Sequence, residues 1–481
     1  MKIAIVRERA NGETRVAATP EIVTRLKAAG ADIAVEKGAG EASRYLDSAY
    51  ADAGATLASS AAEALKGADV VLTVRRPDAA LLKDVAKGAL VIGALDPYGH
   101  EGDIAAIAGT GVSAFAMEFM PRITRAQVMD ILSSQANLAG YQAVIEAATL
   151  YDRALPMMMT AAGTVRAAKV FVMGAGVAGL QAIATARRLG AAVTATDVRA
   201  AAGEQVESLG AKFIMTDALK DASGEGGYAR ELTAEEQAAQ AELVAKHIAN
   251  QDIVITTALI PGRPAPKLVS TAMVESMAPG SVIVDLATER GGNVEVSRAG
   301  EIVTHNGVSV IGFTNMAGRL PATASQLYAK NLQAFLETLI DKDTKAIKVD
   351  WEDELVKATL LTRDGAVVHP NIKAAADAAP APVAAKPAAA KPAAPAKTGA
   401  ASKTGAARKT PAAPVEGEAE PAAPAKTGAA SKTGAAGKTG TPRKSAAKAT
   451  PAEAPAKAGT AASKTKKAPA RKPAADKDGG Q

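Results

Sequence analysis

Cysteine is absent from this 481-residue chain, and aromatic residues make up only 3% of it. Without cysteine there can be no disulfide, thiolate nucleophile, iron–sulfur cluster or cysteine-based zinc site. So few aromatic side chains argue against base stacking on a nucleic acid as the main activity. No metal site is expected either, because the four histidines are scattered and lack the spacing of a ligand pair: His100, His247, His305 and His369.

Long apolar runs are also missing. The N-terminal segment MKIAIVRERANGE has an apolar stretch too short for a signal peptide, and charged residues follow it at once. No run of about 18 apolar residues occurs, so no transmembrane helix is expected. We therefore expect a soluble protein, or one that is at most peripheral to a membrane.

The composition changes sharply at Ala374. From there to Gln481 the chain consists almost only of Ala, Pro, Lys, Thr, Gly and Ser, and the segment PAKTGAASKTGAA at 395–407 recurs at 424–436. Such a segment cannot bury enough apolar surface to offset the chain entropy lost on folding. We expect residues 374–481 to form a disordered Ala/Lys/Pro-rich tail.

Charge separates this tail from the rest of the chain. Residues 374–481 hold 19 Lys and Arg against 7 Asp and Glu, a net charge of +12. Because the whole chain carries +6, residues 1–373 carry a net charge of −6. The tail could tether the protein to an anionic surface, either lipid or nucleic acid. It could equally be a solubilising segment with no defined partner.

Residues 1–373 alternate between short apolar runs typical of strands and longer stretches typical of helices. The expected strands are Lys2–Val6, Asp32–Glu36, Asp69–Val74, Ala89–Gly93, Lys169–Met173, Ala192–Thr196, Lys212–Ile214, Asp252–Thr256 and Ser281–Asp285. The expected helices are Pro20–Ala29, Ser59–Leu65, about Arg125–Arg153, Ala178–Leu189, Ala234–Ala249 and about Ala322–Leu339. A hairpin turning at Arg363-Asp364-Gly365 closes the folded part.

This alternation predicts an α/β protein with two Rossmann-like parallel-sheet domains joined by long helices. The first domain combines residues 1–125 with 322–373, because the last long helix can lead the chain back to it. Residues 126–321 are expected to form the second domain, of Rossmann type, and residues 374–481 the tail.

A glycine-rich turn, GAGVAG, follows the apolar strand Lys169–Met173 and opens a helix. In a dinucleotide-binding turn, Gly174 would allow the tight bend and Gly176 would let the pyrophosphate approach the backbone. Gly179 would let the helix pack on the strand. The free N–H groups at the helix start then face the phosphates. The pattern predicts a dinucleotide site, and the alternative is a purely structural glycine turn.

The strand after this helix ends at Asp197, 18 residues beyond Gly179. A carboxylate at that position can accept hydrogen bonds from the ribose hydroxyls and repels a 2′-phosphate, which favours NAD over NADP. Arg199 lies two residues further on and could in principle meet a 2′-phosphate.

A polar stripe lies at the start of the expected helix after Pro121. Thr124 is a candidate N-cap, and the stripe consists of side chains at helical spacing: Gln127, Asp130, Ser133 and Asn137. Amides, carboxylates and hydroxyls without Lys or Glu suit a carboxamide ligand such as nicotinamide. The alternative is an ordinary solvated helix face.

Four stretches resemble the NAD(H)-binding component of proton-translocating NAD(P) transhydrogenase, in the alanine dehydrogenase/transhydrogenase superfamily. They are PRITRAQVMDILSSQANLAGYQAVIEAA, PMMMTAAGTVRAAKVFVMGAGVAGLQAIATARRLGA, ATDVRAAAGEQVESLGAKFI and ITTALIPGRPAP. The resemblance covers about residues 1–373, and the tail begins where longer members continue into membrane helices. The chain is therefore similar to the split form, in which this component is a separate alpha subunit.

The resemblance implies a division of labour. This component binds NAD(H), a beta subunit binds NADP(H), and a membrane-spanning subunit conducts protons. Hydride passes directly between the two nicotinamides. The family component is a homodimer that docks on the membrane part from the cytoplasmic side, which implies a cytoplasmic protein, peripheral on the inner membrane.

The resemblance also assigns site residues. The nicotinamide end matches Arg122, Ile123, Thr124, Gln127, Val128, Met129, Asp130 and Ser133. The pyrophosphate turn matches Gly174, Ala175, Gly176, Val177 and Gly179, and the adenosine ribose segment matches Asp197, Val198 and Arg199, whose arginine accompanies NAD in the family. Gly227 and Tyr228 match a mobile loop whose tyrosine closes over bound nucleotide, and Gln240 and Leu259 match further contacts.

Direct hydride transfer needs two rings held close together with water excluded, and no side-chain acid or base. The residues expected to serve catalysis therefore act by positioning: Arg122, Gln127, Asp130, Ser133 and Tyr228.

Alanine dehydrogenase is the rival enzyme class, because GETRVAATP at 12–20 resembles its opening, including the carboxylate-binding arginine at Arg15. Its substrate lysine would fall at Arg75, and its catalytic histidine would fall in Gly93–Pro97, which has none. Without a base for the amine proton, amino-acid oxidation lacks its second half. A basic nucleic-acid-binding protein, driven by the tail, is the non-enzyme alternative.

Overall fold

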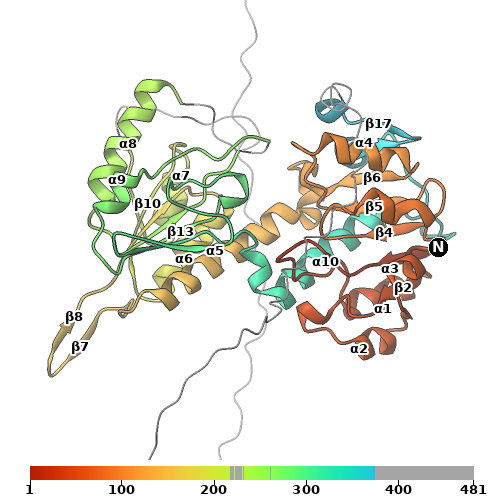
Figure 1. The fold of residues 1–481 in the computed structure, drawn as a ribbon, viewed down its shortest axis with the longest axis horizontal. Helices are drawn as coiled ribbons and strands as arrows, with labels where there is room; N and C mark the ends of the chain where they lie inside the picture. The colour runs from red at the N-terminus through yellow and green to blue at the C-terminus, as the bar shows by residue number, and fades with distance from the viewer. Residues whose placement is uncertain (217–221, 223–229, 231, 261, 374–481) are drawn as a thin grey trace, which may run out of the picture. The chain divides into compact units, whose positions relative to one another are not determined.

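The computed structural model describes residues 1–216, 222, 230, 232–260 and 262–373, and two mostly parallel sheets carry its fold (Figure 1). Within these residues the first sheet has eight strands, in the spatial order β17 (Ala366–Val367), β16 (Leu360–Arg363), β6 (Ser113–Ala116), β5 (Leu90–Gly93), β4 (Val70–Leu72), β1 (Lys2–Ile5), β2 (Asp32–Glu36) and β3 (Thr56–Ala58). The second sheet has seven strands among the same residues, in the order β11 (Lys212–Phe213), β10 (Ala192–Thr196), β9 (Lys169–Met173), β12 (Ile253–Thr256), β13 (Val282–Asp285), β15 (Val308–Ile311) and β14 (Ile302–His305).

Both sheets have the doubly wound order, in which the strand sequence reverses beside the first strand. The reversal lies between β1 and β4 in the eight-stranded sheet, and between β9 and β12 in the seven-stranded sheet. Ligands of such sheets bind outside the carboxyl ends of the strands at this point. The predicted α/β class with two Rossmann-like sheets is confirmed, with β14, β16 and β17 pairing antiparallel at the edges.

The helices follow the sheets in the chain. In the described residues the α-helices are α1 (Pro20–Ala28), α2 (Asp47–Asp52), α3 (Ala61–Leu65), α4 (Glu101–Gly109), α5 (Ile131–Leu150), α6 (Val177–Arg188), α7 (Ala202–Ser208), α8 (Ala234–Ile248), α9 (Thr271–Glu275), α10 (Pro321–Glu337) and α11 (Glu354–Thr359). No helix in these ranges is long and apolar enough to cross a membrane.

Helix α10 returns the chain from the seven-stranded sheet to the first one, where it lies beside strands from the start of the chain (Figure 1). Its apolar face is buried in the same core as Ile3 and Ile5, through side chains that include Tyr328, Leu332 and Phe335. Burial of each such large side chain stabilises the fold by roughly 1.5–3 kcal/mol. The eight-stranded sheet is therefore completed by residues from the far end of the folded chain.

The hairpin β16–β17 adds the last two strands of that sheet. Its two-residue loop is Asp364-Gly365, with φ of 50° and 81°. Positive φ at both positions matches the right-handed twist of the flanking strands, and Asp-Gly is a favoured pair for it. The predicted hairpin is therefore present, and β16 pairs with β6.

A second hairpin stands apart from both large sheets. Strands β7 (Met158–Thr160) and β8 (Gly163–Val165) pair only with each other among the described residues, and every residue of both is exposed. Figure 1 shows this hairpin extending away from the seven-stranded sheet. Sequence reasoning did not predict it.

Both faces of the seven-stranded sheet are covered. One face packs against α5 and α6 through side chains that include Val172, Ala182 and Ile183. The other face packs against α8 through Phe171, Val244 and Ile248. Strand β9 is therefore buried on both sides, as its continuous apolar sequence predicts.

The long helix predicted from about Arg125 to Arg153 is wrong at its start. Residues Thr124–Met129 form a 3₁₀ helix, and α5 begins only at Ile131 and ends at Leu150. Asp130 is its N-cap, because the Asp130 side chain accepts a hydrogen bond from the Ser133 N–H. Asp is a better N-cap than Thr, so the cap at Asp130 replaces the one expected at Thr124.

Candidate nucleotide-binding site

The glycine turn connects β9 to α6 at the point where the strand order reverses. Gly174 has φ of 101°, a left-handed conformation that favours glycine. A Cβ on Gly179 would lie 2.8 Å from the carbonyl carbon of Gly174 and nearer still to its oxygen, so a side chain there would force the helix off the strand. A Cβ on Gly176 would meet nothing within 4 Å. Space for a ligand therefore lies beside Gly176, while Gly174 and Gly179 shape the turn.

Helix α6 begins in this turn without a side-chain cap. Gly176 is its N-cap and supplies no side-chain hydrogen bond, and no acidic residue lies in the first turn. The first N–H groups of a helix have no partner within the helix and carry a partial positive charge. The α6 N-terminus, with Val177 at its start, therefore suits a phosphate group.

Asp197 follows β10 beside this turn and is 7% exposed. Its carboxylate accepts hydrogen bonds from Ala175 N at 2.7 Å and from Arg199 N, Nε and Nη2 at 2.9 Å each. Burial alone would raise the pKa of Asp197, but the hydrogen bonds from Arg199 and Ala175 outweigh burial and lower the pKa. The carboxylate is therefore charged and already tied to the glycine turn.

Sequence reasoning did not predict that the Arg199 side chain donates hydrogen bonds to Asp197. The guanidinium contributes two of the four hydrogen bonds to that carboxylate. The guanidinium is therefore directed at Asp197. Val198, between the two, is half-buried, and its carbonyl accepts a hydrogen bond from Ala222 N at 3.0 Å.

Helices α5 and α6 cross in direct backbone contact. A Cβ on Gly140 of α5 would lie 2.8 Å from the carbonyl carbon of Ala178 in α6, and nearer still to its oxygen. Only glycine at position 140 allows this approach. Ser133 precedes Gly140 by seven residues, or about 10 Å along the helix. One helix therefore fixes the start of the polar stripe relative to the glycine turn.

The polar stripe does not lie on one helix face, because Gln127 lies in the 3₁₀ helix and Asp130 is the N-cap of α5. Asp130 and Ser133 are joined by a hydrogen bond of 2.5 Å from Ser133 Oγ to Asp130 Oδ2. Gln127 and Arg122 are exposed. Asp130 and Ser133 thus form a pair at the α5 N-terminus, with Gln127 on the preceding turn.

Among the other residues assigned to the nicotinamide end, exposure varies. Thr124 and Val128 are exposed, Ile123 is half-buried against the first core, and Met129 is buried in it. The Met129 side chain is therefore not available to a ligand.

Two of the remaining assigned residues lie in the described part of the chain. Gln240 is half-buried in the second turn of α8, and Leu259 is 46% exposed in the loop after β12. Gly227 and Tyr228 lie outside the described residues.

Sequence reasoning missed two residues: Thr257, which supports the glycine turn, and Asn293, which holds the loop after β12. Thr257 donates its hydroxyl hydrogen to the carbonyl of Gly174 at 3.1 Å. Asn293 is fully buried, accepts from Ala258 N at 3.1 Å and donates to the Ala258 and Pro266 carbonyls at 2.8 and 2.9 Å. The sequence signal for Thr257 was its hydroxyl, directly after β12, the strand that pairs with β9. Asn293 had no sequence signal.

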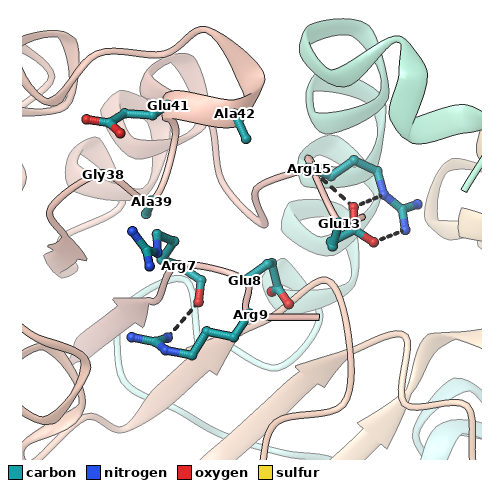
Figure 2. A pocket seen from close by; sticks show the side chains of 9 residues that line it. All are labelled: Arg7, Glu8, Arg9, Glu13, Arg15, Gly38, Ala39, Glu41 and Ala42. Atoms are coloured by element: carbon teal, nitrogen blue, oxygen red, sulfur yellow. Dashed lines mark hydrogen bonds and ion pairs between the residues drawn. The ribbon is translucent and has the colours of Figure 1, made fainter. Parts of the chain in front are cut away.

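A second cavity, of about 360 Å³, lies at the carboxyl ends of β1 and β2 in the other sheet (Figure 2). Six charged side chains line it with Gly38, Ala39 and Ala42, namely Arg7, Glu8, Arg9, Glu13, Arg15 and Glu41. Figure 2 shows Arg15 turned onto Glu13 rather than into the open space. Arg15 Nε and Nη2 donate to the two Glu13 oxygens at 2.8 and 2.7 Å.

Glu13 also holds Arg75, whose Nε donates to it at 2.8 Å. The Glu13 side chain is 1% exposed, and although burial alone would raise its pKa, Arg15 and Arg75 lower the pKa to about 2. Arg75 Nη2 also donates to Glu289 Oε1 at 3.3 Å, and Glu289 follows β13 of the seven-stranded sheet. A substrate carboxylate would have to displace Glu13 from both arginines, which argues against the alanine dehydrogenase alternative.

Glu8 lines the same cavity and bonds across the reversal point of the sheet. Its carboxyl accepts from Val74 N at 2.6 Å, from Thr73 Oγ1 at 3.1 Å and from Arg75 N at 3.2 Å. Burial raises the pKa of Glu8 to about 7. No cluster of side chains that could hold a metal ion occurs within the described ranges.

Comparisons with known proteins agree with this geometry. The family model for the alanine dehydrogenase/PNT N-terminal domain matches residues 4–139, and the one for the C-terminal domain matches residues 143–370. The first of the separate chains of NAD(P) transhydrogenase subunit alpha from Rhodospirillum rubrum is 54% identical over 380 residues, which cover 77% of this chain and 98% of that protein. A solved structure of transhydrogenase from Sinorhizobium meliloti is 58% identical with a TM-score of 0.68, covering 77% of this chain and all of that one.

The chain belongs to the alanine dehydrogenase/PNT family. Alanine dehydrogenase of Bacillus subtilis is 28% identical over 379 residues, covering 77% of this chain and 93% of that protein. The higher identity to the transhydrogenase alpha chain of Rhodospirillum rubrum places this chain with the NAD(P) transhydrogenase subunits. The expected family and enzyme class are confirmed.

Proposed function

We propose that this chain binds NAD(H) at the glycine turn and exchanges hydride with NADP(H) held by a separate beta subunit. The observation that carries this proposal is the joint placement of three features: the uncapped α6 N-terminus, the charged Asp197 beside it, and the close crossing of α5 and α6 at Gly140. The turn and Asp197 suit the adenosine half of NAD(H). The start of α5 then suits the nicotinamide half.

The residues present fit this cofactor. The open space beside Gly176 and the free helix N–H groups are what a pyrophosphate requires. NAD(H) would supply the hydride carbon, and this chain's residues would orient the ring and exclude water. Arg122, Gln127, Asp130 and Ser133 would do so through hydrogen bonds, with Gly227 and Tyr228 covering the nucleotide.

We further propose a homodimer in which the hairpin β7–β8 is the contact arm. Met159 at its tip is 79% exposed, and Met157 and Val165 are also exposed. A two-stranded hairpin is marginally stable alone in water, and a cluster of exposed apolar side chains marks an interaction site. A symmetric partner would cover these side chains.

The Rhodospirillum rubrum relative is named as only one portion of an alpha subunit, which supports further partners. We propose that a beta subunit carries NADP(H), that a membrane-spanning subunit conducts protons, and that this chain docks on them from the cytoplasm. The basic tail, whose net charge is +12, would contact an anionic surface at the membrane or stay without a partner.

Titration with NADH, followed by reconstitution with an NADP(H)-binding beta subunit, tests the proposal. The chain alone should bind NADH and show no turnover with NADPH. Turnover without a partner would reject the division between subunits, and no NADH binding would reject the site.

Positioning residues are tested by Arg122→Ala and Gln127→Ala. Both should slow hydride transfer far more than they weaken NADH binding, because they orient the ring. The matched control is Arg125→Ala, since Arg125 lies on the same segment but pairs with Asp353 at 2.7 Å. Equal losses of rate and affinity would mean that Arg122 and Gln127 contribute affinity alone.

A further inference from the structure

A cavity of about 480 Å³ opens at the other end of the seven-stranded sheet, where the strands begin. Four basic side chains line it: Lys169, Arg187, Lys212 and His247. Lys169 starts β9, Lys212 starts β11, Arg187 lies in the last turn of α6, and His247 lies in the last turn of α8. The nucleotide site lies at the carboxyl ends of the same strands, so this cavity is separate from it.

Strand register brings Lys169 and Lys212 to one face of the sheet, which α8 covers with His247, while Arg187 reaches the cavity from α6 on the opposite face. Lys212 lies opposite Thr194, and Thr194 lies opposite Phe171. Lys169 precedes Phe171 by two residues and therefore points to the same side. Helix α8 covers that side, with the His247 ring 4.7 Å from the Phe171 ring and its Nε2 2.8 Å from Thr194 Oγ1.

The basic side chains of this cavity have no carboxylate partner among the described residues. In the part of the chain that the structure describes, no Asp or Glu lines the cavity, and no carboxylate lies within 4 Å of the charged atoms of Lys169, Arg187 or Lys212. The nearest candidate is Asp252, which accepts from the Lys169 backbone N–H but is held by both terminal nitrogens of Arg166 at 2.7 Å.

Helix dipoles explain only part of this arrangement. Basic residues in the last turns of α6 and α8 are favourable there, which accounts for Arg187 and His247. The two strand lysines have no such reason to converge on the same cavity. Burial, and then Lys212 and Lys169, lower the pKa of His247, so the lysine charges act on the imidazole. Gathered like charges repel unless an anion lies between them.

We propose that this cavity is a second anion site, which binds a small phosphate-bearing molecule independently of NAD(H). A phosphate carries nearly two negative charges and three acceptor oxygens, which suit two ammonium groups and a guanidinium. The volume lies in the range of small-ligand sites, so the phosphate can carry an organic group as well.

The test is calorimetric titration of the full chain, saturated with NADH, with pyrophosphate. The variant Lys169→Gln/Lys212→Gln should bind pyrophosphate at least tenfold more weakly. The control is Lys87→Gln, an exposed lysine of the other sheet's region with no carboxylate within 4 Å among the described residues, and it should change affinity by less than twofold. The basic tail is identical in all three proteins, so its contribution cancels.

Proton NMR supplies a local readout, because the chain has only four histidines. The His247 resonance, identified with His247→Gln, should titrate at higher pH when pyrophosphate is bound. The proposal is overturned if the double variant and the control bind pyrophosphate with equal affinity. It is also overturned if the titration of the His247 resonance does not change when pyrophosphate is added.

Two further measurements complete the design. Each variant must retain NADH binding; if the double variant does not, Lys169→Arg/Lys212→Arg replaces it, and this variant should bind pyrophosphate like the unaltered chain. A loss of pyrophosphate binding in it overturns the proposal. AMP and inorganic phosphate are then compared with pyrophosphate, and tighter AMP binding identifies a nucleotide rather than free phosphate as the ligand. Because NADH binding is measured separately, failure of this proposal leaves the proposed function untouched.

Discussion

Replacement of Gly140 by alanine tests whether the crossing of α5 and α6 sets the geometry of the nucleotide site. The new Cβ would lie 2.8 Å from the Ala178 carbonyl carbon and nearer still to its oxygen, whereas real Cβ atoms essentially never approach closer than 3.0 Å. Helix α5 must therefore withdraw by a distance on the order of 1 Å, an overpacking that costs about 1–3 kcal/mol. Alanine regains about 0.5–1 kcal/mol through its better helix propensity. The net loss of folding free energy should lie between about 0 and about 2.5 kcal/mol.

The larger effect should fall on catalysis. Asp130 and Ser133 at the start of α5 move with the helix, while the glycine turn moves with α6. A misplacement of about 1 Å can cost on the order of 100-fold in rate. Hydride transfer in the reconstituted complex should fall roughly 10- to 100-fold by the same reasoning, measured by stopped-flow absorbance, with a smaller loss of NADH affinity.

Gly102→Ala is the matched control, because Gly102 lies in α4 and a Cβ there meets nothing within 4 Å. This variant should be as stable as the unaltered chain or more so, with unchanged rates. If Gly140→Ala matches Gly102→Ala in stability and in hydride transfer, the reasoning about the helix crossing is refuted.

Three other substitutions probe separate features. Asp197→Ala should weaken NADH binding at least tenfold while the dimer persists, and an unchanged fluorescence titration would contradict the ribose assignment. Glu8→Gln should remove a pH dependence of the free energy of unfolding. The pKa of Glu8 is raised from 4.5 to about 7, so the protonated carboxyl stabilises the fold below pH 4.5. This stabilisation, about 3 kcal/mol in all, is lost as the pH rises through 7. Urea unfolding of both proteins at pH 4.5 and 8 checks this, and parallel pH profiles would refute it. Met159→Lys should shift sedimentation from dimer to monomer, whereas Leu46→Lys, at an apolar site that is 65% exposed against 79% for Met159, should not. A dimer that survives Met159→Lys would exclude the hairpin as its contact.

Local motifs explain why the glycine turn was predictable. Gly174, Gly179 and Asp197 act through backbone geometry within one strand–helix–strand segment, and the structure has the predicted strand bounds for β9 and β10. The start of α5 was misjudged because two possible caps, Thr124 and Asp130, compete, and Asp130 is the better N-cap. Strands β3 and β6 were missed because they are only three and four residues long and hold no run of large apolar side chains.

Long-range pairing explains what the sequence could not predict. Glu13 meets Arg75 across 62 positions, and Arg75 meets Glu289 across 214 positions. No pattern in either segment identifies its partner. The basic cavity was missed for the same reason, since Lys169, Lys212 and His247 come from separate elements and only the sheet register brings them together.

The return of α10 and β16–β17 to the first sheet has a consequence for the nascent chain. Once the ribosome has translated Ile311, every described strand of the seven-stranded sheet has been made. The eight-stranded sheet is begun first, but at that point it still lacks α10, whose Phe335 packs on Phe115. It also lacks Ile372, which is buried near the end of the folded part. Domains usually fold in their order of synthesis. Here the later sheet can fold first, and the earlier one waits with its core open until translation passes Ile372.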